Sequence, residues 1–317
     1  MLENESLSAS PQWGLPGRDR TRAPFMNSGQ PLHLHSWGCA SSPPTVLLHG
    51  FTGYGGSWAT QAEAFSAAGY RVLAPDLLGH GRSPAPPSRD RYEMGRAAAD
   101  LSVLLKSVID EPTHLLGYSL GGRLALYFAL TFPAQVRTLT LESASPGLAT
   151  TAERAQRREH DNALADEIER DGINAFVKFW ESLPMWESQR KRLTSKQRQQ
   201  LREQRLRNRP TGLANSLLGI GTGVQPNLRP RLPYLAIPTL LLAGADDPNY
   251  VDVNSEMAQL IPNARLVVLP HAGHNLHLER PSAFIDRVLS FWQSCDSSRS
   301  RTSELQSATH DANESAA

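Results

Sequence analysis

A single serine stands inside the run Gly117-Tyr-Ser-Leu-Gly121. The pattern Gly-x-Ser-x-Gly is typical of a tight turn between a strand and a helix, where a strained backbone exposes the serine hydroxyl. A serine hydroxyl is a weak nucleophile or base at neutral pH. It needs a histidine to take its proton and a carboxylate to orient that histidine. Ser119 is therefore a candidate catalytic residue if the chain supplies these partners.

Candidate acids and histidines follow Ser119 in the chain order serine, acid, histidine that such turns usually show. Two adjacent acids come after one apolar run, and three histidines come after the last one: Asp246, Asp247, His271, His274 and His277. Polar groups at the carboxyl ends of parallel strands gather at one edge of a sheet. His274 follows Gly273, in a loop flexible enough to reach the serine. From the residues alone, either aspartate and any of the three histidines remain possible partners.

The same chemistry needs two backbone N–H groups that point at developing negative charge. One is expected from Leu120, which directly follows the serine. The other is expected from the loop His-Gly-Phe-Thr-Gly at 49–53, through the N–H of Phe51. These two amides are the predicted oxyanion site.

Short apolar runs, which predict buried strands, alternate along the chain with segments that predict helices. Strands are expected at 44–50, 70–76, 113–119, 136–143, 238–244 and 264–270. Helices are expected at 57–68, 92–109, 120–131, 252–261 and 281–293. This alternation indicates an α/β fold with a parallel sheet covered by helices on both faces.

One long segment, 148–235, interrupts the alternation with helical, Arg/Gln/Glu-rich sequence. Placed between two strands of a parallel sheet, it is predicted to be a lid over the site. It divides the core into 29–147 and 236–294. The polar ends, 1–28 and 295–317, are expected to be disordered.

The bulk composition excludes several classes of protein. The chain has 317 residues, 40% of them hydrophobic, a net charge of +1 and two cysteines. These values give no sign of a nucleic-acid partner or of a disulfide framework. No apolar run is long enough to span a membrane, and the first residues do not resemble a secretory signal. We therefore expect a cytoplasmic protein of unassigned oligomeric state. The basic segment 190–209, with nine Lys and Arg residues, is interpreted as a solvated helix.

Several motifs in the chain, taken together, resemble those of the α/β-hydrolase fold. They are HGF (49–51), DLLGHGRS (76–83), GYSLGG (117–122), GADD (244–247) and AGHNLHLERP (272–281). The resemblance covers about residues 31–293 and implies a mostly parallel sheet with helices on both faces and a helical lid.

Further stretches resemble one family of this fold, 2-succinyl-6-hydroxy-2,4-cyclohexadiene-1-carboxylate synthase. They are GYSLGGR (117–123), LESASPGL (141–148), FVKFWESLPMW (176–186) and LRNRPTGLANSL (206–217). The resemblance implies a lyase of menaquinone or phylloquinone biosynthesis. It would eliminate pyruvate from 2-succinyl-5-enolpyruvyl-6-hydroxy-3-cyclohexene-1-carboxylate without a cofactor or metal, and its serine would act as a base.

The resemblance also assigns roles to single residues. The implied catalytic triad is Ser119, Asp247 and His274, with Phe51 and Leu120 as oxyanion donors. The implied substrate contacts are Tyr118, Arg123, Arg157, Trp180 and Arg207. Arginine suits a substrate with three carboxylates because its planar fork binds a carboxylate through two hydrogen bonds. The family often has Lys-Phe two residues after the triad acid, where this chain has Asn249-Tyr250.

Other interpretations compete with these assignments. The same triad would serve a hydrolase of esters or carbon–carbon bonds, and a non-catalytic ligand-binding protein of this fold can retain it. The three arginines have a structural alternative as solvated helix-surface residues. Trp180 could belong to the core of the lid, which is the interpretation favoured for Trp186.

Overall fold

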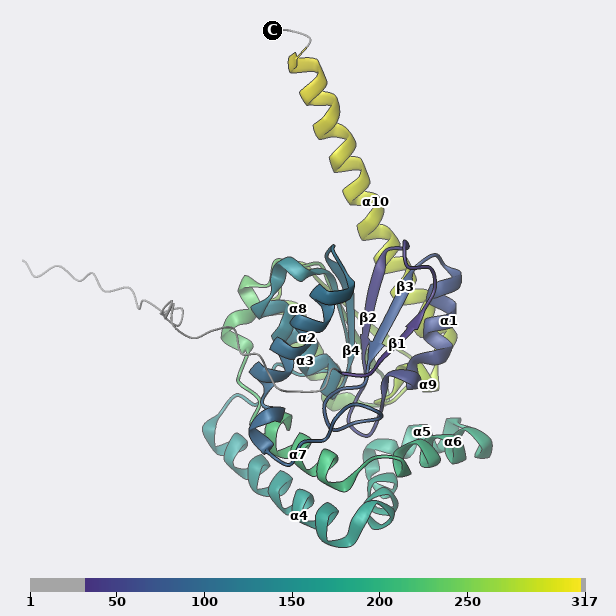
Figure 1. The fold of residues 1–317 in the computed structure, drawn as a ribbon, viewed down its shortest axis with the longest axis vertical. Helices are drawn as coiled ribbons and strands as arrows, with labels where there is room; N and C mark the ends of the chain where they lie inside the picture. Colours follow the sequence, from purple (N-terminus) through teal and green to yellow (C-terminus); the bar gives the residue numbers. More distant parts are fainter. Residues whose placement is uncertain (1–31, 315–317) are drawn as a thin grey trace, which may run out of the picture. The chain divides into compact units, whose positions relative to one another are not determined.

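Among residues 32–314, which the computed structural model describes, seven strands form one sheet (Figure 1). They are β1 (Leu34–Trp37), β2 (Pro44–Leu48), β3 (Arg71–Pro75), β4 (Thr113–Tyr118), β5 (Val136–Glu142), β6 (Thr239–Gly244) and β7 (Ala264–Leu269). Their order across the sheet is β1-β3-β2-β4-β5-β6-β7. Only β1 pairs antiparallel with its neighbour, and the other neighbouring pairs are parallel. The predicted mostly parallel sheet is confirmed.

The inner strands are apolar runs because both of their faces are covered. Every residue of β2, β4 and β6 is buried. Side chains alternate across a strand, so Val46 and Leu48 face one hydrophobic core and Leu47 faces another. A continuous apolar run is thus what a strand between two layers of helices requires.

Helices cover both faces of the sheet (Figure 1). One face carries α2 (Met94–Val108), α3 (Leu120–Thr131) and α8 (Pro248–Leu260). The other carries α1 (Ala59–Ala67) and the first part of α10 (Pro281–Glu314). Shorter helical segments lie in the connections: η1 (Gly55–Trp58), η2 (Arg89–Tyr92), η3 (Pro133–Gln135) and α9 (Leu276–Glu279).

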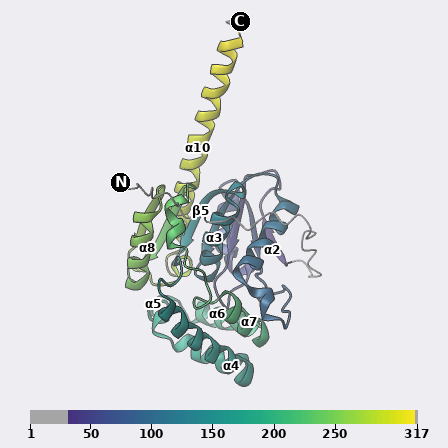
Figure 2. The ribbon, with the colours of Figure 1, turned by 90° about the vertical axis from the view of Figure 1, so that its left-hand side faces the viewer.

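Residues 148–235, here called the helical insertion, join β5 to β6 without adding a strand. They form α4 (Thr151–Ser182), η4 (Pro184–Trp186), α5 (Glu187–Arg192), α6 (Ser195–Leu206), α7 (Pro210–Ile220) and η5 (Arg229–Tyr234). A capping box at Thr150 starts α4, and Gly172, with φ 77°, breaks its helical geometry. Helices α4 and α7 share a small hydrophobic core of their own, and Figure 2 shows the insertion as a separate layer at one end of the sheet.

Two differences from the sequence prediction stand out. Strand β1 was not predicted, because its four residues are only partly buried and lack an apolar run. Helix α10 continues to Glu314, where a disordered tail from residue 295 was expected. No proline or glycine follows Pro281 within it, so nothing in the sequence ends the helix. The expected disorder of 1–28 lies outside the described residues, and the domain boundaries stay predictions.

None of the helices within the described part of the chain combines the length and the apolar character needed to cross a bilayer.

Candidate active site

The serine of the Gly-x-Ser-x-Gly motif lies at the sharp turn between β4 and α3. Ser119 has φ 50° and ψ −109°, a conformation that is unusual for a residue with a side chain. Its own N–H donates to the carbonyl of Glu142 at 2.9 Å, which ties the turn to the end of β5. The residue is only partly buried, so its hydroxyl is held at an accessible edge of the sheet.

Glycines flank this turn because the backbone passes too close for side chains. A Cβ on Gly117 would lie 2.4 Å from the carbonyl oxygen of Gly121. A Cβ on Gly121 would lie 2.4 Å from the carbonyl oxygen of Leu48, in the neighbouring strand. Both separations are too short for real carbon–oxygen contacts, so the motif is a packing requirement as well as a turn signal.

We therefore expect Gly121→Ala to destabilise the protein by about 1–3 kcal/mol, the usual cost of overpacking. The control is Gly95→Ala in α2, where the new methyl group would have 3.5 Å to its nearest neighbour, the Tyr127 hydroxyl. Alanine in a helix is favoured over glycine by up to about 1 kcal/mol, so this variant should be neutral or stabilised. Urea unfolding of both variants measures the difference. Equal stability of the two would contradict the packing argument.

Three side chains from the ends of different strands form a hydrogen-bonded chain. His274 Nε2 lies 3.1 Å from Ser119 Oγ, and His274 Nδ1 lies 2.8 Å from Asp247 Oδ2. Asp247 follows β6 at the start of α8, and His274 lies in the loop after β7. With the proton on Nδ1 directed at the carboxylate, Nε2 is free to accept the serine proton. The arrangement is that of a Ser-His-Asp triad.

The competing acid and histidines have other partners. Asp246 forms an ion pair with Arg192 of the insertion, at 2.6 Å. His271 is exposed to solvent. His277 is buried and contacts the carboxylate of Glu142, with Nδ1 2.8 Å from Oε2. None of these groups contacts Ser119, so of the open alternatives the structure brings only Asp247 and His274 to the serine.

The loop after β2 is shaped by His49. His49 Nε2 accepts a hydrogen bond from the Leu77 N–H at 2.9 Å, and Nδ1 lies 2.9 Å from the Gly50 carbonyl oxygen. Burial lowers the pKa of His49 to about 4, so the ring is neutral and can accept that bond at pH 7. The loop presents Phe51 beside the serine turn, where Leu120 begins α3 and its N–H has no acceptor within the helix. The loop and the start of α3 thus lie on either side of the serine, and the oxyanion role of the two amides stays a prediction.

Aromatic side chains of the insertion cover this site. The Trp180 ring lies 5.3 Å from the Phe51 ring, and the Trp186 ring lies 5.7 Å from the His274 ring. The two tryptophans also contact each other at 5.8 Å. Trp186, interpreted from the sequence as insertion core, is buried against Trp180 and Arg205 of the insertion and also contacts the triad histidine. The Tyr118 ring packs against His274 from the strand side, at 5.6 Å.

A cavity of about 500 Å³ opens beside the triad, between the loop after β2 and helix α6. Phe51, Tyr118 and Trp186 line it together with the arginines Arg205 and Arg207. Ser119 and His274 do not line it themselves, but their direct neighbours do. The cavity is large enough for a small organic ligand, and its charged lining residues are these two arginines and Glu203.

Arg205 is a site residue that the sequence analysis missed. It is buried, its Nη1 lies 3.3 Å from Glu181 Oε1, and its guanidinium stacks over the Trp186 ring at 5.3 Å. Its buried Nε has no hydrogen-bond partner among the described residues. The predicted Arg207, two residues later, is exposed at the cavity rim. Arg205 could not be distinguished from the other arginines of the basic run, because its burial depends on Glu181 and Trp186.

Arg123 is buried in the first turn of α3, outside the cavity lining. Its Nη1 donates to the carbonyl of Ile220 at 2.7 Å and to Gln225 Oε1 at 3.2 Å. Burial lowers the pKa of its guanidinium to about 10, so it remains charged at pH 7. Arg123 is therefore not a solvated surface residue, and it also fastens α3 to the insertion.

Tyr250 links Arg123 to the triad, and the sequence analysis gave it no role. Its ring lies 4.7 Å from the His274 ring. Burial raises the pKa of its hydroxyl, and the positive charges of Arg123 and Arg157 oppose that shift. Arg157 is about half exposed and pairs with Asp161 at 2.8 Å. The predicted arginines thus lie in two groups: Arg123 and Arg157 are near Tyr250 and do not line the cavity, whereas Arg207 does.

Comparison with known proteins agrees with this geometry. Residues 43–281 match the family model of the alpha/beta hydrolase fold. A 2-succinyl-6-hydroxy-2,4-cyclohexadiene-1-carboxylate synthase of Serratia proteamaculans is 32% identical over 255 residues, 80% of this chain and 94% of the relative. A Bacillus subtilis protein, provisionally named as the same synthase, is 43% identical over 244 residues. The match covers 77% of this chain and 88% of the relative.

A solved structure is similar throughout the core. The structure of MenH from S. aureus superimposes with a TM-score of 0.80 at 34% identity, covering 83% of this chain and 99% of that one. Sequence and structure thus point to the same relatives, over nearly their full length. The chain belongs to the 2-succinyl-6-hydroxy-2,4-cyclohexadiene-1-carboxylate synthase family of the α/β-hydrolase fold.

Proposed function

We propose that this chain eliminates pyruvate from 2-succinyl-5-enolpyruvyl-6-hydroxy-3-cyclohexene-1-carboxylate, with Ser119, His274 and Asp247 as the proton-transfer machinery. The product is 2-succinyl-6-hydroxy-2,4-cyclohexadiene-1-carboxylate. The observation that carries the proposal is the hydrogen-bonded triad beside an arginine-lined cavity, in a chain of this family. The proposed partner is thus a small anionic molecule, and the proposed location is the cytoplasm.

The double bonds of substrate and product define the proton that must be removed. The substrate has one ring double bond, at carbon 3, and the product has two, at carbons 2 and 4. Carbon 2 therefore loses a proton, the double bond moves along the ring, and the bond from carbon 5 to the enolpyruvyl oxygen breaks. The leaving enolpyruvate gains a proton and becomes pyruvate, so the reaction needs neither an oxidant nor water.

The triad fits the first of these steps. His274 accepts the proton of Ser119, and the serine oxygen then takes the proton from carbon 2. Asp247 stabilises the imidazolium that results. Carbon 2 bears the carbonyl of the succinyl group, so its deprotonation places negative charge on that carbonyl oxygen. In this proposal the amides of Phe51 and Leu120 bind that oxyanion.

The arginines suit the three carboxylates of this substrate. Arg205 and Arg207 lie along the cavity, and the unpaired buried Nε of Arg205 is a donor that a carboxylate can use. Arg123 and Arg157 supply positive charge on the Tyr250 side. Tyr118 lines the cavity, and Trp180 packs against Phe51 and Trp186, which also line it. In this proposal the helical insertion serves as the lid that excludes water from the reacting atoms.

The decisive assay is to incubate the protein with the cyclohexene substrate and follow pyruvate release. We expect stoichiometric pyruvate with no added metal or cofactor. If the protein instead hydrolyses a small neutral ester and releases no pyruvate, it is a hydrolase. If it turns over neither but binds a ligand, it is a binding protein.

Replacing Arg157 or Arg207 with alanine should lower kcat/KM for the anionic substrate by about ten- to a hundredfold, the worth of a charge-assisted hydrogen bond. Arg207 is exposed, so its removal should leave folding unaffected, whereas Arg157→Ala also removes the ion-pair partner of the buried Asp161 and should cost some stability. Arg123→Ala should lower kcat/KM as well, with some loss of stability because of its two internal hydrogen bonds. Lysine should rescue each variant only partly, because it lacks the planar fork.

The readout is the ratio of kcat/KM for the anionic substrate to kcat/KM for a neutral ester. Arg170→Ala is the matched control, since Arg170 is an exposed arginine of the same insertion that pairs only with Asp171. The control should keep the wild-type ratio. A ratio that stays constant across the Arg157 and Arg207 variants would mean that these arginines bind no carboxylate.

A further inference from the structure

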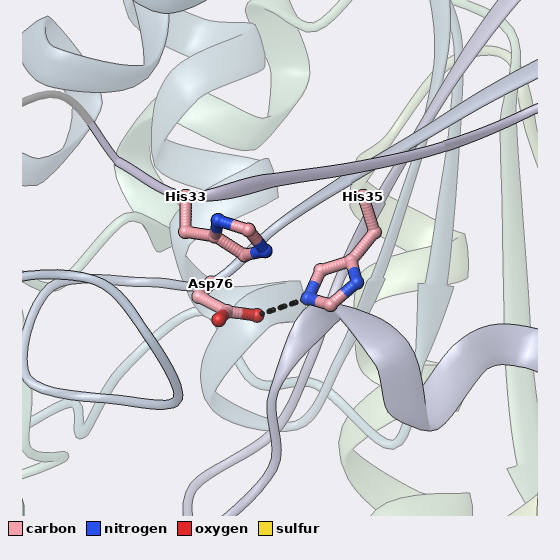
Figure 3. A group of neighbouring side chains, drawn as sticks. All are labelled: His33, His35 and Asp76. Atoms are coloured by element: carbon pink, nitrogen blue, oxygen red, sulfur yellow. Dashed lines mark hydrogen bonds and ion pairs between the residues drawn. The ribbon is translucent and has the colours of Figure 1, made fainter.

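Two histidines and a buried carboxylate lie together at the edge of the sheet, and the proposed reaction uses none of them. His33 immediately precedes β1, His35 lies in β1, and Asp76 follows β3. Residues two apart in an extended chain place their side chains on the same face. In Figure 3 both imidazole rings accordingly lie next to the carboxylate of Asp76, that of His33 above it and that of His35 beside it.

The carboxylate is held in a fixed position by the backbone. Asp76 Oδ1 accepts a hydrogen bond from the Gly55 N–H at 2.6 Å, and Oδ2 accepts one from the Arg82 N–H at 2.7 Å. The Asp76 side chain is fully buried. A carboxylate oxygen can accept more than one bond, so Oδ2 retains capacity for a further ligand, whereas the second contact of Oδ1 is His35. Asp76 is therefore a preorganised, negatively charged ligand.

The two histidine rings differ in whether they already have a hydrogen-bond partner. His35 Nε2 lies 3.0 Å from Asp76 Oδ1, so His35 has a hydrogen-bond partner. The His33 ring makes no hydrogen bond with any residue that the structure describes, although it contacts the His35 ring edge-on at 4.7 Å. A simple ion pair between His35 and Asp76 explains the positions of these two side chains. It leaves the position of the His33 ring, over the same carboxylate, without a function.

The spacing of the three groups is close to that of a metal site. One ligand atom from each of His33, His35 and Asp76 lies within 4.8 Å of the other two. In a tetrahedral zinc site with ligand distances of about 2.0–2.2 Å, neighbouring ligand atoms are about 3.3 Å apart. The pair of His35 and Asp76 already has nearly this separation. A side-chain rotation that moves the His33 nitrogen by about 1.5 Å would complete the third position.

We propose that His33, His35 and Asp76 bind one divalent late transition-metal ion, best matched by Zn²⁺. Two imidazoles and one carboxylate are ligands typical of zinc, whereas magnesium and calcium prefer oxygen ligands alone. Three protein ligands leave the fourth tetrahedral position open to water. The bound ion would fasten edge strand β1 to the loop after β3, which is a structural role separate from the triad.

Zinc binding is tested on the full chain without a histidine tag, after treatment with a chelator. Competition with a chromophoric zinc indicator should show one equivalent of tightly bound Zn²⁺, and the ion should raise the melting temperature, because it binds the folded state. His33→Gln and His35→Gln should each weaken zinc binding by at least about 10- to 100-fold, the cost of losing even an outer contact of a metal site. Asp76 is left unchanged because two backbone bonds depend on it.

His160→Gln is the matched control, since His160 is an exposed histidine on α4. Its zinc affinity should equal that of the wild type. Co²⁺ in place of Zn²⁺ provides a second readout. Tetrahedral ligation by nitrogen and oxygen should give visible absorption bands. Ligation by the exposed Cys39 would add a thiolate charge-transfer band, which we do not expect. Absence of stoichiometric zinc binding, unchanged affinity in both His33→Gln and His35→Gln, or a thiolate band would each overturn the proposal. The pyruvate assay is independent of all three outcomes.

Discussion

The Ser119→Ala variant is expected to release pyruvate at least about a hundredfold more slowly than the wild type, because a positioned base contributes roughly 10²- to 10⁴-fold. The only side-chain hydrogen bond of Ser119 within the described residues is with His274 Nε2, at 3.1 Å. Removing the hydroxyl therefore removes the base and little else. The left-handed backbone at this position is as costly for alanine as for serine, so stability should change little.

Rates and folding must be measured on the same preparations. Pyruvate release gives kcat and KM, and thermal melting followed by circular dichroism reports folding. Ser107→Ala is the control, because Ser107 is an exposed serine of α2 that bonds only to the Leu104 carbonyl. A Ser119→Ala protein that is folded and keeps activity within tenfold of wild type would show that the hydroxyl is not the base.

The sheet was predictable from sequence because its strands are buried on both faces. Apolar runs such as 44–50 and 238–244 must be buried away from water on both sides. The structure places β2 and β6 there. β1 escaped prediction for the opposite reason. It is an edge strand held by pairing with β3, and its own residues carry almost no apolar signal.

The identity of the triad was only partly predictable. The Gly-x-Ser-x-Gly turn marks Ser119 because a local steric requirement fixes it. Asp246 and Asp247 share the same local sequence context. They differ in their tertiary contacts, which come from distant parts of the chain. The end of α5, within the insertion, brings Arg192 to Asp246, while the start of α8 directs Asp247 at His274.

Residues of the insertion were the least predictable part of the site. A basic, helical sequence does not say which arginine faces inward, because every turn of the helix offers one. Arg205 is buried since Glu181 and Trp186 lie opposite it, and both come from elements earlier in the chain. The same long-range packing brings Trp186 to His274. The break in the strand pattern marked this segment as a lid, but only the resemblance to a family pointed to single residues within it.

The Asp247→Asn variant is expected to lose about 10⁴-fold in kcat, the loss known for removing the orienting carboxylate of a serine triad. Asp247 Oδ2 accepts a hydrogen bond from the Nδ1 side of His274. An asparagine that presents its NH₂ group there favours the other tautomer, in which Nε2 carries the proton and cannot accept one from Ser119. The uncharged amide also fails to stabilise the imidazolium that the reaction forms.

Asp246→Asn is the control that the chain itself supplies, because it makes the same chemical change one residue away. Asp246 pairs with Arg192 at the surface, where its side chain is 41% exposed, and such pairs contribute about 0–1 kcal/mol to stability. Arg192 also lies 3.6 Å from Glu279, so it keeps a partner after the substitution. Activity should therefore remain close to wild type. If Asp246→Asn proves the more damaging of the two, the acid of the triad is Asp246, and the ion pair between Asp246 and Arg192 must open for the insertion to release it.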